Sequence, residues 1–409
     1  MRRIGIEKIN AYGSSLYLDQ RELARVRDRD PEKVVADFLI HRRSLNPPYE
    51  DTITMGANAA NRMLTAEDKA SIGMLVVGTE SSLDFGKPIS TNIHGALGLP
   101  ANVRNYETKH ACYSGVAALD AAVNWIASGL NNGKKALVIA TDFSRMHLNL
   151  KEEFVLGGVA TAILVSDAPM VVELELGKKG CWTTDAYDTF RPSATREMGN
   201  NEVSLFTYMD ALEGAYGDYL EKLPEPIDFD SYFDFNLYHT PFAGMAFQAH
   251  RTLCNLARPR RKPEIRESFE QKVLPALRHA QQVGGTYGSS NFLGICSLVT
   301  GDAAPTGGER IGFFAYGSGA IGEFYSAVVC PEARDVVSAM RIDEQLAARR
   351  SVTVDEYEAI EMLRERYIEQ PNVVPDRNYP EGWYDAFYRG KGNLVLREVK
   401  DFTRVYEWS

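Results

Sequence analysis

Short apolar runs alternate with a helix-like stretch in the first half of the chain. Residues 73–80 (GMLVVGTE) and 135–142 (KALVIATD) are apolar for several positions and end in polar side chains, a pattern typical of buried strands. Between them, apolar residues recur at helical spacing, at Val116, Leu119, Val123 and Ile126. Strand, helix and strand in this order predict an α/β protein whose sheet is buried.

Further strands and helices are expected along the rest of the chain. Apolar runs predict strands at residues 160–165, 171–176, 312–316 and 327–330, with a last one at 393–399. The charged segment from about residue 331 to 369 is expected to be rich in helix, most clearly at VTVDEYEAIEMLRERY. The second half therefore continues the α/β pattern and ends in a charged extension.

Composition fits a globular protein and excludes several function classes. The 409 residues are 44% hydrophobic and carry 45 basic against 55 acidic side chains, a net charge of −10, which disfavours binding to nucleic acid or anionic lipid. No apolar run approaches the roughly 18 residues of a membrane span. No apolar signal core follows the amino terminus, so we expect a cytoplasmic protein. Five scattered cysteines without a CxxC pair predict neither a disulfide framework nor a metal site.

One cysteine stands at a position suited to catalysis. Cys112 lies in KHACYSG, directly before the predicted helix. The positive end of a helix dipole and unpaired backbone amides lower the pKa of a thiol and favour the nucleophilic thiolate. The alternative is a small buried hydrophobic residue, and position alone leaves both interpretations open.

A carboxylate and a histidine are the next candidates. Glu80 ends a predicted strand, where a desolvated carboxylate suits a general acid or base, although such a residue can equally cap the next element. His239 lies in YHTPF, before a turn restricted by proline, and an imidazole there can donate a proton to a developing alkoxide. His110 and His250 compete with it for this role, and a histidine that is simply buried in the core is the alternative.

A Gly-rich turn is predicted at residues 316–324 (YGSGAIGEF). Its glycines allow a ligand to approach the backbone, and Ser318 can offer an amide or a hydroxyl. The turn has neither the GxGxxG spacing of dinucleotide-binding loops nor the GxxxxGK phosphate loop. We therefore predict no nucleotide cofactor here.

Taken in order, four motifs resemble the 3-hydroxy-3-methylglutaryl-CoA (HMG-CoA) synthase family: GTES at 78–81, ACYSG at 111–115, HTPF at 239–242 and YGSG at 316–319. YDTFRP at 187–192, SLFTYMDAL at 204–212 and the charged tail agree, so the resemblance covers nearly the whole chain. It implies a thiolase-like fold of two pseudo-repeated α/β halves in a five-layered αβαβα core, normally a homodimer. We place the halves at residues 1–168, with the cysteine, and 169–409, with the histidine and the charged extension.

The resemblance also implies roles for particular residues. Cys112 is expected to take up an acetyl group as a thioester, Glu80 to remove a methyl proton, and His239 to protonate the acceptor's ketone oxygen. The amides of Cys112 and Ser318 are expected to form an oxyanion hole. Substrate-binding roles are expected for Ser204, Tyr287 and Ser318. No metal or redox cofactor is needed.

Departures from the family pattern indicate a particular branch. After HTPF, synthases of primary metabolism typically have KM and further lysines that face the phosphates of coenzyme A, whereas this chain has Gly244-Met245-Ala246-Phe247-Gln248. Phosphates favour Lys and Arg partners, and a phosphopantetheine arm on a carrier protein needs fewer of them. PPYEDTITMGANAA at 47–60 and DFGKPIST at 84–91 look like synthases of bacterial polyketide β-branching.

The expected reaction is therefore condensation of acetyl, from a donor acyl carrier protein, with the β-ketone of a polyketide on another carrier protein. One alternative is a primary-metabolic synthase that uses acetyl-CoA and acetoacetyl-CoA. A second alternative is a thiolase-fold module that binds carrier proteins without catalysis; the presence of Glu80, Cys112 and His239 argues against it.

For two local features of the sequence, more than one interpretation stays open. Where the family commonly has Gly-Asn before a tyrosine, this chain has Gly284-Gly285, so Thr286, Ser289 or a water must replace the lost amide, or the site is less polar. The basic loop 258–262 (RPRRK) is either a solvated loop or a docking patch for an acidic carrier protein.

Overall fold

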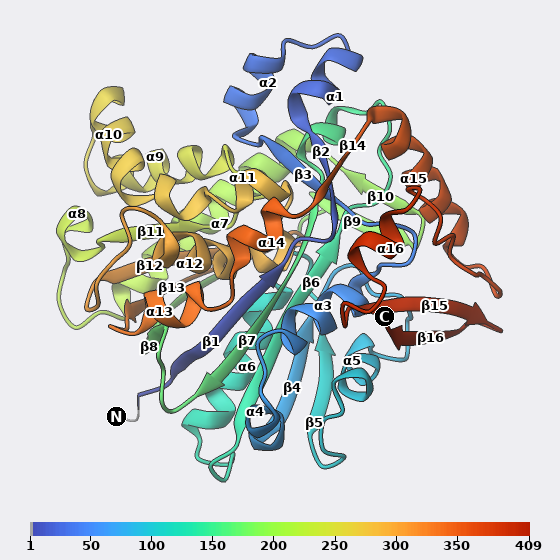
Figure 1. Ribbon diagram of the computed structural model, residues 1–409. Coiled ribbons are helices and arrows are strands. Elements are labelled where there is room, and N and C mark those ends of the chain that lie inside the picture. Colours follow the sequence, from blue (N-terminus) through green and yellow to red (C-terminus); the bar gives the residue numbers. More distant parts are fainter. Residues whose placement is uncertain (1–2) are drawn as a thin grey trace.

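The computed structural model describes residues 3–409, and its largest element is a mixed β-sheet (Figure 1). Within the described residues this sheet has nine strands, in the order β11 (Phe235–Tyr238), β12 (Arg310–Gly317), β13 (Ile321–Val329), β8 (Val172–Thr183), β1 (Gly5–Tyr12), β7 (Gly158–Ser166), β6 (Lys135–Phe143), β4 (Ile72–Gly78) and β5 (Arg104–Thr108).

The sheet contains the same arrangement twice. In the first half β4 runs parallel to β6, β6 antiparallel to β7, and β7 antiparallel to β1. In the second half β11 runs parallel to β12, β12 antiparallel to β13, and β13 antiparallel to β8. The halves meet where β1 pairs with β8 at Gly5–Glu173 and Ile6–Val172. The two half-sheets are thus continuous along one short edge.

Helices on both sides of each half-sheet produce five layers. On β4, Met74 and Val76 pack with helix α6 (Ser114–Ala127), whereas Leu75 and Val77 pack with α3 (Thr52–Asn61) and α5 (Ile89–Leu97). On β13, the Ser326 hydroxyl bonds to α7 (Asn201–Glu221) and the neighbouring Tyr325 hydroxyl to α12 (Ser290–Thr300). Helices α6 and α12 therefore form the central layer, as the thiolase-like fold predicts.

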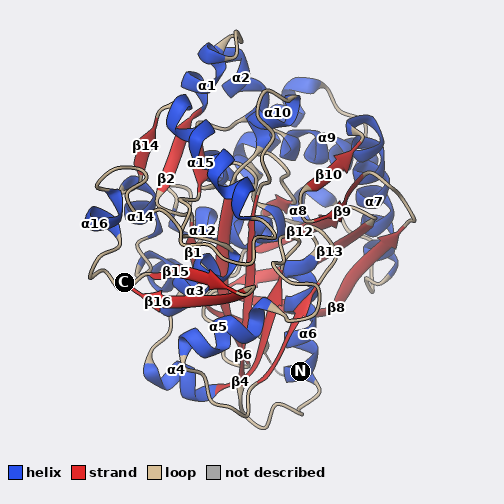
Figure 2. Cartoon of the chain, turned by 90° about the vertical axis from the view of Figure 1, so that its right-hand side faces the viewer, coloured by secondary structure: helices blue, strands red, loops and turns tan. Residues whose placement is uncertain are grey.

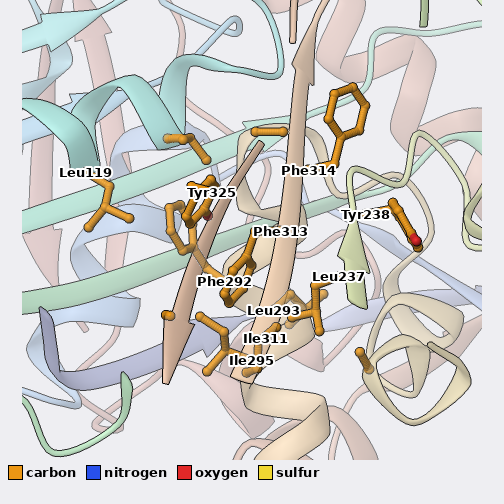
Figure 3. Close-up of a cluster of buried hydrophobic side chains, with 14 of the residues drawn as sticks. Leu119, Leu237, Tyr238, Phe292, Leu293, Ile295, Ile311, Phe313, Phe314 and Tyr325 are labelled. Carbon is orange, nitrogen blue, oxygen red and sulfur yellow. The ribbon is translucent and has the colours of Figure 1, made fainter. Parts of the chain in front are cut away.

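The core of the second half is aromatic (Figure 3). Residues Ser290 to Val299 of α12 are all buried, and Phe292 lies against β12 and β13. There Phe313 and Tyr325 stack with ring centroids 4.8 Å apart. Because every residue from Ser290 to Val299 is buried, this apolar and aromatic packing fixes the position of α12 and of the residues at its amino-terminal end.

From residue 350 onward, the charged carboxyl-terminal extension packs on one side of the molecule (Figures 1 and 2). Its main helix, α15 (Val354–Tyr367), begins with a capping box in which Thr353 and Glu356 each accept the other's backbone amide. Around it lie α16 (Trp383–Phe387), the hairpin of β15 (Leu394–Lys400) and β16 (Thr403–Trp408), and a small sheet of β14 (Arg350–Val352), β2 (Leu16–Asp19) and β3 (Arg42–Leu45). The first two helices of the extension, α13 (Ala333–Ser338) and α14 (Ile342–Ala347), lie apart from it, against β1.

The remaining helices and turns lie between these elements along the chain. They are α1 (Gln20–Val26), α2 (Pro31–Phe38), α4 (Ala66–Ser71), α8 (Phe229–Tyr232), α9 (Met245–Ala257), α10 (Lys262–Lys272), α11 (Ala280–Val283) and the 3₁₀ turns η1 (Lys151–Val155), η2 (Leu274–Leu277) and η3 (Tyr287–Ser289). Within residues 3–409, none of the helices combines the length and apolar character needed to span a bilayer.

The predicted strands are present, but two were predicted too short. Strand β8 continues to Thr183 through a polar, exposed segment that gives no apolar signal, because α7 covers only part of it. Strand β13 begins at Ile321, inside the segment that the glycines led us to predict as a turn. The turn itself is limited to residues 318–320 because Gly317 pairs directly with Ile321.

Candidate active site

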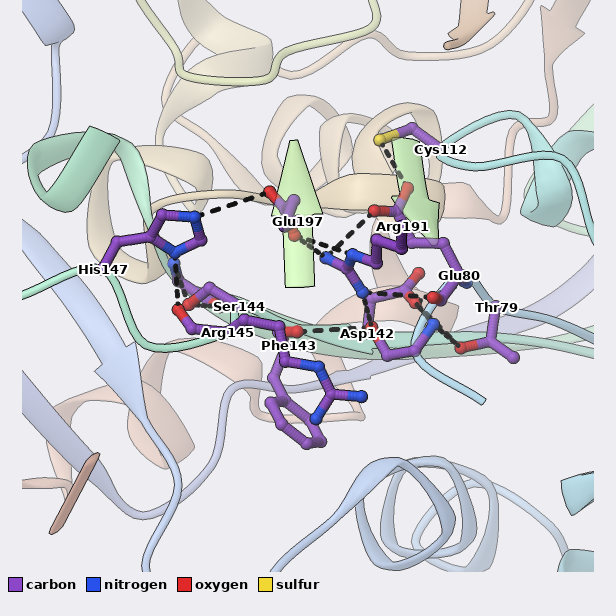
Figure 4. Close-up of polar contacts among 12 residues, drawn as sticks. Thr79, Glu80, Cys112, Asp142, Phe143, Ser144, Arg145, His147, Arg191 and Glu197 are labelled. Carbon is purple, nitrogen blue, oxygen red and sulfur yellow. Dashed lines mark hydrogen bonds and ion pairs between the residues drawn. The ribbon is translucent and has the colours of Figure 1, made fainter. Parts of the chain in front are cut away.

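Cys112 and Glu80 are in direct contact at the ends of two elements that pack together. Glu80 follows β4 by two residues, and Cys112 precedes α6 by two. A side chain at Gly78 would meet the Ser114 carbonyl oxygen at 2.4 Å, so glycine is what allows α6 to begin against the end of β4. The Cys112 thiol donates to Glu80 Oε2 across 3.0 Å (Figure 4).

Burial determines the acid–base properties of this pair. The Glu80 side chain is 14% exposed, and burial raises its pKa, as expected, while Arg191 opposes the rise. Burial also raises the pKa of Cys112, and the neighbouring Glu80 carboxylate raises it further. The sequence-based expectation of a lowered thiol pKa was wrong, because the helix-end argument ignores desolvation and this carboxylate. The thiol therefore keeps its proton at rest and has an acceptor for it in contact.

A hairpin adds two charged residues that the sequence interpretation missed. Strands β9 (Thr189–Ser193) and β10 (Arg196–Gly199) pair antiparallel and bring Arg191 and Glu197 to the site (Figure 4). Arg191 Nη2 lies 3.3 Å from Glu80 Oε1 and 2.6 Å from Glu197 Oε2. Arg191 belongs to the YDTFRP motif. The motif therefore pointed to this segment, but it did not show that Arg191 contacts Glu80.

Asp142, at the polar end of β6, holds the loop that carries Glu80. Its Oδ1 accepts hydrogen bonds from the Thr79 hydroxyl at 2.8 Å and from the Glu80 and Ser81 amides at 2.8 and 3.1 Å. Burial and the charge of Glu80 raise the pKa of Asp142. In the sequence, the only indication that Asp142 belongs to the site was its place at the polar end of a predicted strand.

His239 directly follows β11 and lies beneath a cluster of hydroxyl groups. Its Nδ1 is 3.0 Å from the hydroxyl of Ser290, the first residue of α12. That hydroxyl is also 2.5 Å from the Thr286 hydroxyl and accepts the Thr240 amide at 3.2 Å. His239 is 2% exposed, and burial lowers its pKa to about 3. The imidazole is therefore neutral at physiological pH.

One competing histidine, His250, is engaged elsewhere. In His250, Nδ1 contacts the Tyr238 hydroxyl at 3.0 Å and Nε2 contacts the Ser268 hydroxyl at 2.9 Å. His110 packs edge-on against Tyr113 with centroids 6.0 Å apart. Among the hydrogen bonds of residues 3–409, the Nε2 of His239 has no partner, so this nitrogen is available to a substrate.

The predicted substrate-binding residues are linked to these groups only indirectly. The Tyr287 hydroxyl lies within the electrostatic influence of Glu197, Arg191, Glu80 and Cys112, and burial raises its pKa. Ser318 follows Tyr316, whose ring centroid is 6.2 Å from that of His239. Ser204 lies one turn before Tyr208 on α7, and the Tyr208 ring is 6.3 Å from His239. Among the described residues, none of these three side chains has a hydrogen bond to Glu80, Cys112 or His239.

The two expected oxyanion-hole amides are unengaged. Within the described chain, the amides of Cys112 and Ser318 donate to no protein group. The same part of the chain contains no group of three or more His, Cys, Asp or Glu side chains placed to hold a metal ion. Two backbone donors are thus left free for a substrate oxygen.

The residues proposed to replace the family's asparagine do not do so. Thr286 donates to the Thr240 carbonyl at 2.9 Å, and Ser289 donates to the Ala140 carbonyl at 3.1 Å. Both hydroxyls are fully buried and are used within the protein. Neither points to a substrate, so the site at Gly285 is less polar unless a water occupies it.

The basic loop is largely neutralised by nearby acids. Arg260 is only 6% exposed and pairs with Asp230 at 2.7 Å, and Arg258 pairs with the same carboxylate at 3.4 Å. Arg261 is 84% exposed and pairs with Glu264 at 2.6 Å. Arg260 is therefore part of the fold, and any docking role of the loop falls to the exposed Arg258 and Arg261 or to Lys262.

Comparisons with known proteins agree with this geometry. The family models for the hydroxymethylglutaryl-coenzyme A synthase N and C termini match residues 1–169 and 260–395. The polyketide biosynthesis 3-hydroxy-3-methylglutaryl-ACP synthase PksG of Bacillus subtilis is 35% identical, with 99% of each chain covered. The hydroxymethylglutaryl-CoA synthase of Enterococcus faecalis is 31% identical over 87% of this chain and 91% of its own length.

Solved structures extend the comparison to the whole fold. The curacin biosynthetic pathway HMG synthase is 38% identical and superposes with a TM-score of 0.94, with all of both chains covered. A structure of the same synthase with acetyl donor-ACP has 37% identity and a TM-score of 0.94, again over all of both chains. MvaS in complex with 3-hydroxy-3-methylglutaryl coenzyme A has 33% identity and a TM-score of 0.89, also over all of both chains. This chain belongs to the hydroxymethylglutaryl-CoA synthase family.

Proposed function

We propose that this protein is an acyltransferase that condenses acetyl, delivered by a donor acyl carrier protein, with the β-ketone of a carrier-bound polyketide intermediate. The observation that carries the proposal is the contact between the Cys112 thiol and the Glu80 carboxylate, with the free Nε2 of His239 completing the set. The similarity to PksG and to an HMG synthase solved with donor-ACP supports carrier proteins as partners. No redox cofactor or metal is required by this chemistry.

The first step is acetyl transfer. Glu80 takes the Cys112 proton across the 3.0 Å contact, and the thiolate attacks the acetyl carbonyl carbon. The carbon–sulfur bond to the donor's pantetheine breaks, and the departing sulfur takes the proton back from Glu80. The amides of Cys112 and Ser318 stabilise the oxyanion that forms during the attack.

The second step forms the carbon–carbon bond. Glu80 removes a proton from the acetyl methyl group, and the resulting carbanion attacks the β-ketone carbon. The ketone oxygen takes a proton from Nε2 of the neutral His239, which requires the tautomer with hydrogen on that nitrogen and with Nδ1, 3.0 Å from the Ser290 hydroxyl, as an acceptor. The proton that Glu80 removed from the methyl group then replaces the one that His239 gave up, so both residues return to their resting states. Water then cleaves the Cys112 thioester, which releases a carboxylate and restores the thiol.

Packing at Gly244 supports a carrier-bound donor over free coenzyme A. A side chain at Gly244 would meet the Asp37 carbonyl oxygen at 2.5 Å, so helix α2 occupies the space where the family's phosphate-facing lysine would begin. The alternative function, primary-metabolic synthesis from acetyl-CoA and acetoacetyl-CoA, keeps the same catalytic residues. A non-catalytic carrier-binding module would not need the Cys112–Glu80 contact.

Intact-mass analysis separates these functions. The protein is incubated with acetyl-CoA or with an acetylated carrier protein, and acetylation of Cys112 is followed over time. We expect much faster acetylation from the carrier. Equal or faster acetylation from free acetyl-CoA supports the primary-metabolic function, and no acetylation from either donor supports the non-catalytic module.

Three further expectations are also proposals. We propose a homodimer, because among the described strands β5 pairs on one side only and leaves an edge that a second copy can extend. Light scattering of the purified protein tests this, and a monomer at micromolar concentration contradicts it. We propose the division at residues 168/169, which the repeated strand order supports, and a location in the cytoplasm.

A further inference from the structure

The β9–β10 hairpin surrounds Glu80 with a cation and a second anion. Arg191 Nη1 donates to the Glu80 carbonyl at 3.1 Å and to the Ser81 hydroxyl at 3.3 Å, while Nη2 faces Glu80 Oε1 at 3.3 Å. Its Nε donates to Glu197 at 2.7 Å. One guanidinium thus contacts both the backbone and the carboxylate of Glu80 and is shared with Glu197 (Figure 4).

We propose that Arg191 and Glu197 are positioning residues that hold the Glu80 carboxylate against Cys112 and set how strongly it binds the proton taken from the acetyl methyl group. The proposal rests on the proposed function, since it concerns the base of that reaction. Neither residue touches the reacting atoms in this account, and both act through Glu80.

The balance of charge explains why two residues are needed. With Glu80 ionised, one cation lies between two carboxylates. When Glu80 takes the methyl proton it becomes neutral, and Arg191 remains paired with Glu197, so no buried guanidinium is left without a counter-ion. Arg191 alone would hold Glu80 ionised and weaken it as a base, whereas Glu197 alone would repel it and favour its protonated form.

Other groups near Glu80 do not supply this balance. Cys112 donates to it, Asp142 faces its amide, and the Tyr287 hydroxyl lies near it; these three groups are neutral or acidic. His147 Nε2 lies 4.0 Å from Glu197, on the side away from Glu80. Arg145, close enough to influence Arg191, points away from the pair in Figure 4. Within residues 3–409, Arg191 is the one cation in ion-pair contact with Glu80.

The test separates proton removal from acetylation. The full-length protein is acetylated by an acetyl carrier protein in D₂O, and deuterium incorporation into the acetyl methyl is measured by quenched intact mass at several pH values. The variants are Arg191→Met, Arg191→Lys and Glu197→Gln. The matched control is Arg196→Met, because Arg196 is exposed on the same hairpin.

The pKa of Glu80 is expected to shift in opposite directions in Arg191→Met and Glu197→Gln. Exchange requires ionised Glu80, so its rate rises with pH through the Glu80 pKa. In Arg191→Met that pKa rises, the acidic limb moves to higher pH, and exchange at neutral pH falls about 100-fold because the base is also misplaced. In Glu197→Gln the pKa falls and the limb moves to lower pH. Arg191→Lys recovers most of the loss, and Arg196→Met matches the wild type.

Two outcomes overturn the proposal. If the profiles of Arg191→Met and Glu197→Gln superpose on the wild-type profile, or if both limbs move in the same direction, the pair does not set the basicity of Glu80. The proposed function still stands in that case, because the wild type exchanges. If the wild type is acetylated but exchanges no deuterium, or is not acetylated at all, the proposed function itself fails.

Discussion

Replacing Gly244 with alanine tests why this chain lacks the lysine that is expected before α9 in synthases of primary metabolism. The new Cβ would lie 2.5 Å from the Asp37 carbonyl oxygen and 3.3 Å from the Phe38 carbonyl oxygen. Both contacts are backbone atoms, so no side chain can rotate away. The Gly244 amide also donates to the Phe38 carbonyl at 2.9 Å, which ties the two segments together.

The cost can be estimated from these contacts. Overpacking costs about 1–3 kcal/mol, and weakening one backbone hydrogen bond costs about 1 kcal/mol. Since relaxation of α2 relieves part of the overlap, we expect Gly244→Ala to lower the free energy of unfolding by about 2 kcal/mol. Phe38 packs edge-on against Phe242 at 5.5 Å, three residues after His239, so displacement of α2 should also raise the KM for carrier substrates.

Chemical denaturation measures the loss, with Gly217→Ala as the matched control. Gly217 lies within α7, and a Cβ there meets nothing within 4 Å; alanine should stabilise it by about 0.5–1 kcal/mol. Gly244→Lys should lose stability as well and should not gain use of acetyl-CoA. A Gly244→Ala protein as stable as the wild type, together with a Gly244→Lys protein that is efficiently acetylated by acetyl-CoA, would refute the steric argument.

Three further predictions concern individual side chains. Ser290→Ala removes the partner of His239 Nδ1 and should slow condensation about 10-fold with unchanged acetylation; equal loss in both steps would show a general structural effect. Burial lowers the pKa of His239 to about 3, so its protonated form is lost above that pH and its ring NMR signals should not titrate between about pH 5 and 8; a midpoint near the ordinary value of about 6.5 would contradict its burial. Arg260→Glu should destabilise the fold by about 2 kcal/mol because it breaks the pair with Asp230, whereas the exposed Arg261→Glu should not. If the loop docks carrier proteins, Arg261→Glu also raises their KM without affecting a pantetheine mimic, and an unchanged KM assigns the loop to solvent.

Much of the fold followed from the sequence because its signals are local. The apolar runs of β4, β6 and β7 are buried on both faces and therefore read as strands. The polar end of β8 and the start of β13 gave no such signal, because their pairing depends on each other rather than on their own composition. Cys112 and Glu80 could also be predicted, because each lies in a sequence motif: GTES at the end of β4 and ACYSG at the start of α6.

The rest of the site depends on contacts between distant segments. Arg191 lies 111 positions after Glu80 and Ser290 lies 51 after His239, so no local pattern shows that they touch. The lowered Cys112 pKa was predicted from the helix end alone and failed because desolvation and Glu80 dominate. Arg260 read as a surface charge, although Asp230, 30 positions earlier, draws it into the fold.

Product formation on a β-ketoacyl carrier protein tests the central claim most directly. The wild type, Cys112→Ala and Glu80→Gln are each incubated with an acetyl donor carrier and a β-ketoacyl acceptor carrier, and both carriers are followed by intact mass. We predict that the wild type adds the acetyl carbons and one water to the acceptor, that Cys112→Ala adds nothing, and that Glu80→Gln forms no product. Full product formation by either variant would contradict the mechanism.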